Sequence, residues 1–150
     1  MKKILIMLVM SIVFFSSCKK NDDDNLTDNP NIPNAVFDTG SAINTSLPQY
    51  NQLQFPGNFV ILNNSNYGIN GIVVYFSGGD YSAFELSDPN HSLNSCSVLS
   101  VEGVIATCTC EDGNSYEILN GSPNEGTSGQ YYLKRYFVEV NGNIIRIYNN

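Results

Sequence analysis

The chain has 150 residues, of which 42% are apolar and 14% charged, and its formal net charge is −7. Nine tyrosines and eight phenylalanines supply enough aromatic surface for a compact core, so the composition excludes a disordered chain. The excess of acidic residues repels phosphate backbones and makes nucleic acid a poor candidate partner.

The N-terminus has the pattern of a secretory signal. Met1–Lys3 is positively charged, Ile4–Phe15 is apolar but too short to span a bilayer, and Ser16 and Ser17 are small residues that precede Cys18. We predict that residues 1–17 form a signal peptide. An ordinary signal with an incidental cysteine, or an uncleaved anchor, is the alternative. The position of Cys18, where the apolar run stops, argues against it.

The segment resembles a bacterial lipoprotein signal, in which the bond before the cysteine is cut and Cys18 becomes the acylated first residue. Each buried acyl methylene contributes about 0.8 kcal/mol, so several chains on one residue anchor a protein without a transmembrane helix. The resemblance implies a lipid-anchored protein of the bacterial cell envelope, with the membrane as its partner. Asp22–Asp24 resembles the surface-export signal of Bacteroidetes lipoproteins, so the outer membrane is expected, with the periplasmic and surface faces both open.

The rest of the chain divides into a tether and one domain. After Cys18 comes a stretch rich in Thr, Asp, Asn and Pro that lacks an apolar period. We assign residues 18–49 to the lipidated cysteine and a flexible tether, and residues 50–150 to a single β domain.

Short β-branched and aromatic runs bounded by Asn, Gly and Pro predict strands, and no helical period is sustained after the signal. Three such runs are Asn58–Leu62, Gly71–Phe76 and Tyr81–Leu86, with a turn at residues 77–80. Near the C-terminus, Asn141–Asn143 lies between two alternating apolar runs, and Asn-Gly at that place is a strong hairpin signal. The predicted fold class is all-β and antiparallel.

The stretch from Asp88 to Tyr116 holds the only histidine and every cysteine except Cys18. It is predicted to form two loops separated by a hairpin with its turn around Val101 and Glu102. Thiols occur in both loops. This layout is typical of a site held between two loop tips.

The order of these elements resembles the Rieske iron–sulfur domain. There one loop carries Cys-x-His, a hairpin follows, a second loop carries Cys-Pro-x-His-Gly, and a Leu-Lys-x-Tyr/Phe strand precedes a closing hairpin. The match covers about Leu53 to the C-terminus, with Leu133–Tyr136 and Ile144–Ile147 at the final strands. The resemblance implies a Rieske-like antiparallel β domain with a cluster-binding-type subdomain, and as cofactor a 2Fe-2S cluster for electron transfer.

The ligand motifs are degenerate. A Rieske cluster needs two thiolates on one iron and two imidazoles on the other. His91 and Cys108 stand at two ligand positions, but the first cysteine is replaced around Asp88, and Glu111, or Asp112 if the loop is shifted by one, stands at the second histidine. The chain has one histidine in total, so no realignment restores the site. We therefore expect no cofactor, with the 2Fe-2S cluster as the alternative.

The residues alone leave open whether the remaining cysteines bind a metal or form a disulfide, and which of them pair. Cys96, Cys108, Cys110 and His91 formally make a zinc-binding set, but in an oxidising compartment thiols pair. The resemblance implies a disulfide between Cys96 and Cys110, since several Rieske proteins join their two loops there, while pairing of Cys96 with Cys108 stays possible. A loop of this length, about 15 residues, gives on the order of 3 kcal/mol.

These observations predict an extracytoplasmic, lipid-anchored Rieske-fold protein without a functional cluster that acts as a binding or structural module. The alternative is an electron-transfer protein with altered ligation. The sequence shows no nucleophile, base and orienting group at a spacing that supports catalysis. We therefore expect that the protein is not an enzyme, and we assign neither catalytic nor metal-binding residues. A protein partner at the cell envelope is possible but not identified.

Overall fold

The computed structural model describes residues 29–63 and 66–150. Its regular elements are ten strands and one short 3-10 helix: β1 (Phe37–Asp38), β2 (Ile43–Asn44), η1 (Asn51–Gln54), β3 (Phe59–Leu62), β4 (Ile72–Phe76), β5 (Tyr81–Glu85), β6 (Leu99–Glu102), β7 (Ile105–Cys108), β8 (Ser115–Glu117), β9 (Phe137–Asn141) and β10 (Ile144–Asn149). Every strand pairing is antiparallel, which confirms the predicted fold class. No helix in the described part of the chain is long and apolar enough to cross a membrane.

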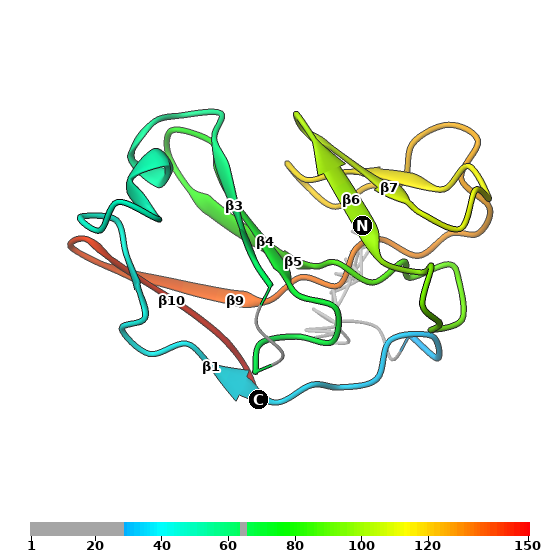
Figure 1. Cartoon of the computed structure of the whole chain (residues 1–150), viewed down its shortest axis with the longest axis horizontal. Coiled ribbons are helices and arrows are strands. Elements are labelled where there is room, and N and C mark those ends of the chain that lie inside the picture. Colours follow the sequence, from blue (N-terminus) through cyan, green and yellow to red (C-terminus); the bar gives the residue numbers. More distant parts are fainter. Residues whose placement is uncertain (1–28, 64–65) are drawn as a thin grey trace, which may run out of the picture.

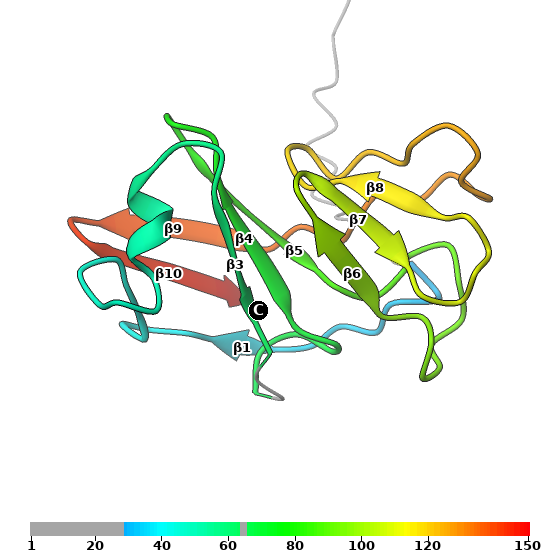
Figure 2. The same cartoon turned by 45° about the horizontal axis from the view of Figure 1, so that its top comes forward.

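The strands form three small sheets (Figure 1). In the first, β10 pairs with β1, β2 and β9; the second has the order β3-β4-β5, and the third β6-β7-β8. Figure 2 shows the second sheet between the β9–β10 hairpin on one side and the third sheet on the other. The third sheet lies where the resemblance places a cluster-binding-type subdomain.

The turn residues of the sequence set the hairpins. Gly142 adopts a φ of 57° in the turn between β9 and β10, where Ile144 pairs with Asn141. The β6–β7 hairpin is present, but its turn lies at residues 103–104 rather than around Val101 and Glu102. The reason is that Gly103, with a φ of 59°, takes the left-handed conformation that the turn needs.

Two hydrophobic clusters form the core, and strand β4 contributes to both. Ile72 and Val74 point into the cluster shared with the first sheet, whereas Val73 and Tyr75 point into the cluster shared with the third sheet. This alternation follows from the two-residue side-chain period of a strand. The β3-β4-β5 sheet is therefore the layer that holds the third sheet in place.

The N-terminal boundary of the domain differs from the prediction. Residues 29–49, assigned to a tether, carry β1 and β2, and Ile32, Phe37 and Ile43 are buried. Strands of two residues are too short to show an alternation, which explains why the pattern gave no signal. The domain begins by residue 29 instead of residue 50. The predicted signal peptide, Cys18 and the tether up to residue 28 lie outside the described residues.

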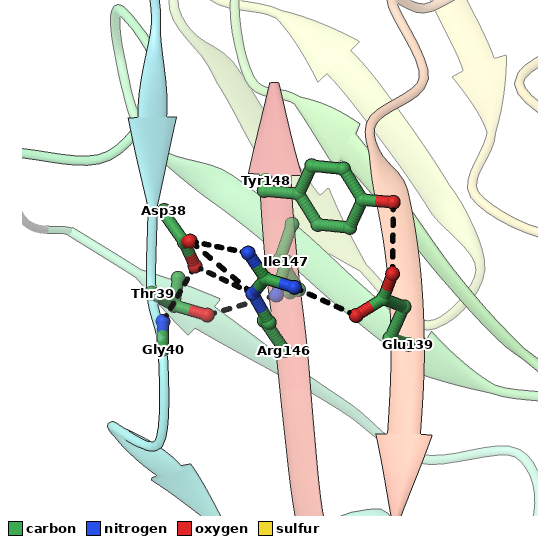
Figure 3. Close-up of polar contacts among 7 residues, drawn as sticks. All are labelled: Asp38, Thr39, Gly40, Glu139, Arg146, Ile147 and Tyr148. Atoms are coloured by element: carbon green, nitrogen blue, oxygen red, sulfur yellow. Dashed lines mark hydrogen bonds and ion pairs between the residues drawn. The ribbon is translucent and has the colours of Figure 1, made fainter. Parts of the chain in front are cut away.

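The solvent face of the first sheet carries a polar cross-strand contact (Figure 3). On β10, the Arg146 guanidinium lies 2.6 Å from the Asp38 carboxylate of β1 and 2.8 Å from the Glu139 carboxylate of β9. Glu139 also accepts a hydrogen bond from the Tyr148 hydroxyl at 3.0 Å. These groups are exposed, so the contact adds to strand pairing without forming a buried site.

Candidate functional site

The predicted two-loop site lies at the end of the third sheet. The first loop, residues 88–97, is closed at its base where the Asp88 backbone N–H donates to the Ser97 carbonyl at 2.9 Å. The second loop, residues 109–114, is closed where the Cys108 N–H donates to the Asn114 carbonyl at 2.9 Å. Because Ser87 bridges Val98 beside β6, both loops extend from the same end of the sheet.

A disulfide joins the two loops. Cys96 and Cys110 are bonded with their Cα atoms 4.7 Å apart, so the pairing implied by the resemblance is present and pairing of Cys96 with Cys108 is not. Thr109 adds a second link, since its hydroxyl donates to the Cys96 carbonyl at 2.7 Å. The loops are thus held together covalently and by a hydrogen bond beside it.

Asp88, which stands in the region of a missing cluster cysteine, is fully buried. Its carboxylate accepts hydrogen bonds from the Tyr116 hydroxyl, from the Asn114 side-chain amide at 2.9 Å and from the Asn90 backbone N–H at 2.8 Å. Burial, followed by the hydrogen bond to Asp88, raises the pKa of Tyr116 well above its ordinary value. The hydroxyl therefore stays protonated and donates a hydrogen bond to the carboxylate.

Asn90 extends this network to a third segment of the chain. Its side-chain amide donates to the Tyr131 carbonyl at 2.8 Å and to the Tyr116 hydroxyl at 3.0 Å, and its side-chain oxygen accepts from the Tyr131 N–H at 2.9 Å. Gly129 fits beside this amide because a Cβ there would collide with the Asn90 side chain. The glycine-rich segment after β8 is thereby fixed onto the first loop.

Cys108 is the one free cysteine of the described residues, and it is buried at the end of β7. Burial is the main cause that raises the pKa of its thiol to about 12. Because the thiolate is the reactive and metal-binding form, this thiol is inert at neutral pH. Its sulfur lies within 4.8 Å of carboxylate oxygens of Asp88 and Asp112.

His91 and Glu111, the other two predicted ligand positions, do not come together with Asp88 and Cys108. His91 is partly exposed, and its Nδ1 lies 2.7 Å from the Ser92 carbonyl oxygen. Glu111 is exposed and adopts a φ of 60°, and it joins neither ligand group of the described residues. Asp112, the alternative for a loop shifted by one, is the acidic residue that approaches His91 and Cys108. Of the four positions Asp88, His91, Cys108 and Glu111, the structure brings Asp88 and Cys108 together.

The donor set does not fit a Rieske cluster. Such a cluster needs two thiolates and two imidazoles. The described residues offer the free thiol of Cys108 and the imidazole of His91, while the other two sulfurs are bonded to each other. The Asp88 carboxylate is already engaged by three donors, and no buried side-chain nitrogen or oxygen of the described residues lacks a partner. What occupies this position is a completed hydrogen-bond network.

Sequence reasoning missed the residues that complete this network. Asn90 and Asn114 lie inside the stretch from Asp88 to Tyr116 and Tyr116 ends it, but no pattern marks these three residues as functional. Loop amides have no periodicity, and their partners lie far along the chain, 26 residues for Asn114 and Asp88. The nearest available signal is composition, since Asn90 and Asn94 lie in the first loop and Asn114 ends the second.

The start of the described chain also contacts the site. The side-chain amides of Asn29 and Asn31 donate to the Pro89 carbonyl at 2.8 and 3.0 Å. Pro89 follows Asp88 directly, so the chain enters the folded domain alongside the first loop. This contact was unexpected because residues 29–49 were assigned to the tether.

Comparisons with known proteins identify similar chain folds among ferredoxins. No family model and no curated protein sequence matches the chain. It is similar to the Sphingomonas yanoikuyae B1 ferredoxin, with 18% identity over 66% of this chain and 94% of that chain and a TM-score of 0.45. It is also similar to the ferredoxin of carbazole 1,9a-dioxygenase from Nocardioides aromaticivorans IC177, with 15% identity over 64% of this chain and 88% of that chain and a TM-score of 0.40.

A third similar chain comes from the complex of reduced oxygenase and oxidized ferredoxin in carbazole 1,9a-dioxygenase. It is 22% identical over 62% of this chain and 82% of that chain, with a TM-score of 0.43. At these low identities and TM-scores, the assignment of the site depends on the residues of this chain.

Proposed function

We propose that this chain is an exported, lipid-anchored β domain that carries no iron–sulfur cluster and acts as a binding or structural module of the bacterial cell envelope. The proposal includes no catalytic activity. Its two-loop end corresponds to the cluster-holding end of the Rieske domain that the sequence resembles. In this chain the same end is held by a disulfide and by the Asp88 network.

The Asp88 network is the observation that carries the proposal. An iron ligand must have a lone pair directed at the metal and space for the metal beside it. Asp88 instead accepts three hydrogen bonds from Tyr116, Asn114 and Asn90 at a fully buried position. Removing any one of these donors leaves the buried carboxylate without one of its hydrogen-bond partners, which lowers the free energy of unfolding by about 1–3 kcal/mol. The network therefore favours a fixed structural role.

The lipid anchor is supported by the sequence of residues 1–18, where an apolar run ends at Cys18. The folded part begins with Asn29 and Asn31 bonded to Pro89 of the first loop. A chain anchored at Cys18 would therefore join the folded domain beside the two-loop end.

The alternative function is electron transfer by a cluster with altered ligation. Metal analysis of the full-length lipidated chain in detergent distinguishes it from the proposed cluster-free module. The protein is produced in cells that assemble clusters, with a Rieske ferredoxin produced in parallel as a positive control. Iron, acid-labile sulfide and thiols in denaturant are then counted. We expect a colourless protein without stoichiometric iron or sulfide and with one thiol, because acylation blocks Cys18 and the disulfide blocks Cys96 and Cys110.

The variant Cys108→Ser assigns that thiol, since it should remove it entirely without changing the metal analysis. Stoichiometric iron and sulfide in the wild-type chain, lost in Cys108→Ser, would establish the electron-transfer alternative and refute the cluster-free module.

A further inference from the structure

One ligand group of the two-loop end shares only Asp112 with the group that contains Asp88 and Cys108. A ring nitrogen of His91, the sulfur of Cys110 and a carboxylate oxygen of Asp112 all lie within 4.8 Å of one another. His91 comes from the first loop, and the other two come from the second. Imidazole, thiolate and carboxylate are the three ligand types that zinc takes in proteins.

A fourth ligand is present in latent form. The sulfur of Cys96 is bonded to that of Cys110 at 2.17 Å, so breaking the disulfide leaves two thiols beside His91 and Asp112. Tetrahedral zinc, with Zn–S bonds of about 2.3 Å and Zn–N bonds of about 2.0 Å, needs ligand atoms about 3–4 Å apart. The three ligand atoms already lie within about 1 Å of that spacing.

Neighbouring groups contact two of the ligands. A carbonyl oxygen can only accept, so the 2.7 Å contact with Ser92 places a proton on Nδ1 of His91, and in the neutral ring Nε2 is then the nitrogen that can bind a metal. One carboxylate oxygen of Asp112 accepts from the Asn114 backbone N–H at 2.9 Å. Hydrogen bonds of this kind orient metal ligands and set their tautomers.

We propose that reduction of the Cys96–Cys110 disulfide creates a zinc site formed by His91, Cys96, Cys110 and Asp112. A dithiol reductant supplies two electrons and two protons, the S–S bond becomes two thiols, and the reductant leaves as its own disulfide. Zinc binding then releases the two thiol protons. The two loops are cross-linked covalently in the oxidised protein and through the metal in the reduced one.

This site excludes the other nearby sulfur. Cys108 is buried, and its sulfur lies near Asp88 and Asp112 rather than in the group formed by His91, Cys110 and Asp112. Asp88 is held by Tyr116 and Asn114 and has no need of a metal. The zinc site therefore uses Cys110, which holds no ligand position of the Rieske motif, and Asp112, which is the alternative to Glu111 at the second histidine position. The inference goes beyond the proposed module function.

The test is a titration of the full-length chain in detergent with Zn²⁺ alone, with and without prior reduction by a phosphine, which does not compete for zinc as a dithiol does. We expect the reduced protein to bind one Zn²⁺ at least about 100-fold more tightly than the oxidised protein. Co²⁺ should give the strong visible absorption of a tetrahedral site and a thiolate charge-transfer band. Zinc should also raise the thermal unfolding midpoint of the reduced chain.

Matched variants assign the ligands in the reduced protein. His91→Ala and Asp112→Asn should each weaken zinc binding by about tenfold or more, and Asp112→Asn keeps an oxygen that can accept from Asn114. Glu111→Gln, at the neighbouring acidic residue, and Cys108→Ser should leave the affinity and the Co²⁺ spectrum unchanged.

Equal zinc affinity in the oxidised and reduced proteins would overturn the proposal. So would loss of binding in Cys108→Ser together with its retention in His91→Ala, because that result assigns the metal to Asp88, Cys108 and Asp112. A reduced chain that is unfolded and does not refold on addition of Zn²⁺ would overturn it as well. None of these results bears on the iron and sulfide content that tests the proposed function.

Discussion

Two buried carboxylates near the end of β5, Glu85 and Asp88, are held in the same way in different surroundings. Glu85 accepts from the Tyr136 hydroxyl at 2.5 Å and from the backbone N–H groups of Ile69 and Asn70 at 2.8 and 2.9 Å. Asp88 likewise combines a tyrosine hydroxyl with a backbone N–H. Both side chains are fully buried. The same arrangement, a buried carboxylate that accepts from a tyrosine hydroxyl and from backbone N–H groups, therefore holds a loop at each place.

The difference between the two places is sulfur. Around Glu85 the partners are backbone groups and hydroxyls, including Ser87 at 2.8 Å. Around Asp88 lie the thiol of Cys108 and, across the loops, the Cys96–Cys110 disulfide. Because the Glu85 network works without any sulfur, the Asp88 network needs no cluster to explain it. At the two-loop end, the Cys108 thiol and the disulfide are added to a hydrogen-bond network that is structural by itself.

The largest expected effect is that of Glu85→Ala, which removes the acceptor of Tyr136, Ile69 and Asn70 at once. Leaving several buried donors unsatisfied should lower the free energy of unfolding by about 4 kcal/mol. Urea unfolding measures this, with Glu102→Ala at an exposed strand residue as the control that should change little. A loss below about 1 kcal/mol for Glu85→Ala would show that the Glu85 network is dispensable.

Removing the disulfide with Cys96→Ser and Cys110→Ser together should lower the free energy of unfolding by about 3 kcal/mol. The loss reflects the larger conformational freedom of the unfolded chain once the loops are no longer joined. Urea unfolding of the double variant is compared with Cys108→Ser, which breaks no bond. If the double variant and Cys108→Ser lose the same stability, the disulfide does not stabilise the two-loop end.

Alkaline pH should separate the two carboxylate regions, because Cys108 belongs to one of them. Its folded-state pKa is raised from 9.0 to about 12, mainly by burial, so its contribution is complete below pH 9.0 and is lost as the pH rises toward 12. Burial also raises the pKa values of Tyr116 and Tyr136 above 10.0, so their contributions begin to fall above that pH.

Unfolding in urea at pH values from about 8 to about 11 measures this dependence, with a loss approaching about 1.4 kcal/mol per pH unit for each group. In Cys108→Ser the loss should begin near pH 10.0 rather than near pH 9.0, since only the tyrosines remain. An unchanged onset would contradict the assignment of a buried, protonated thiol.

The smallest effect is expected on the exposed face of the first sheet. The hydrogen bond from Arg146 lowers the pKa of Asp38 from 3.8 to about 2. The contribution of this pair is thus present above pH 3.8 and is lost as the pH falls through about 2. Nuclear magnetic resonance titration of Arg146→Ala should return the pKa of Asp38 toward 3.8, and added salt should shift the wild-type value in the same direction.

Much of the fold follows from local sequence. The β-branched and aromatic run from Ile72 to Phe76 and the turn at Gly142 correspond to β4 and to the β9–β10 hairpin. In contrast, β1 and β2 could not be predicted because two-residue strands carry no period. Ile32 was missed for the same reason, since a single apolar residue in a polar stretch gives no pattern.

The site was predictable in position but less so in composition. Concentration of cysteines and His91 located the two loops, and the Rieske resemblance supplied the Cys96–Cys110 pairing. The choice between Glu111 and Asp112 depends on loop conformation, since Glu111 adopts a φ of 60° and Asp112 is the residue that groups with His91, Cys108 and Cys110. A single sequence does not encode such a turn visibly at a residue that is neither glycine nor asparagine.

The central claim, that a buried carboxylate clamp holds the two loops where a Rieske domain holds a cluster, is tested most directly by a double-mutant cycle. Asp88→Asn and Tyr116→Phe are combined, and the free energy of unfolding of all four proteins is measured in urea. We expect single losses of about 2 and about 1.5 kcal/mol and a coupling energy of at least about 1 kcal/mol. Strictly additive losses, or a variant as stable as the wild type, would contradict the claim.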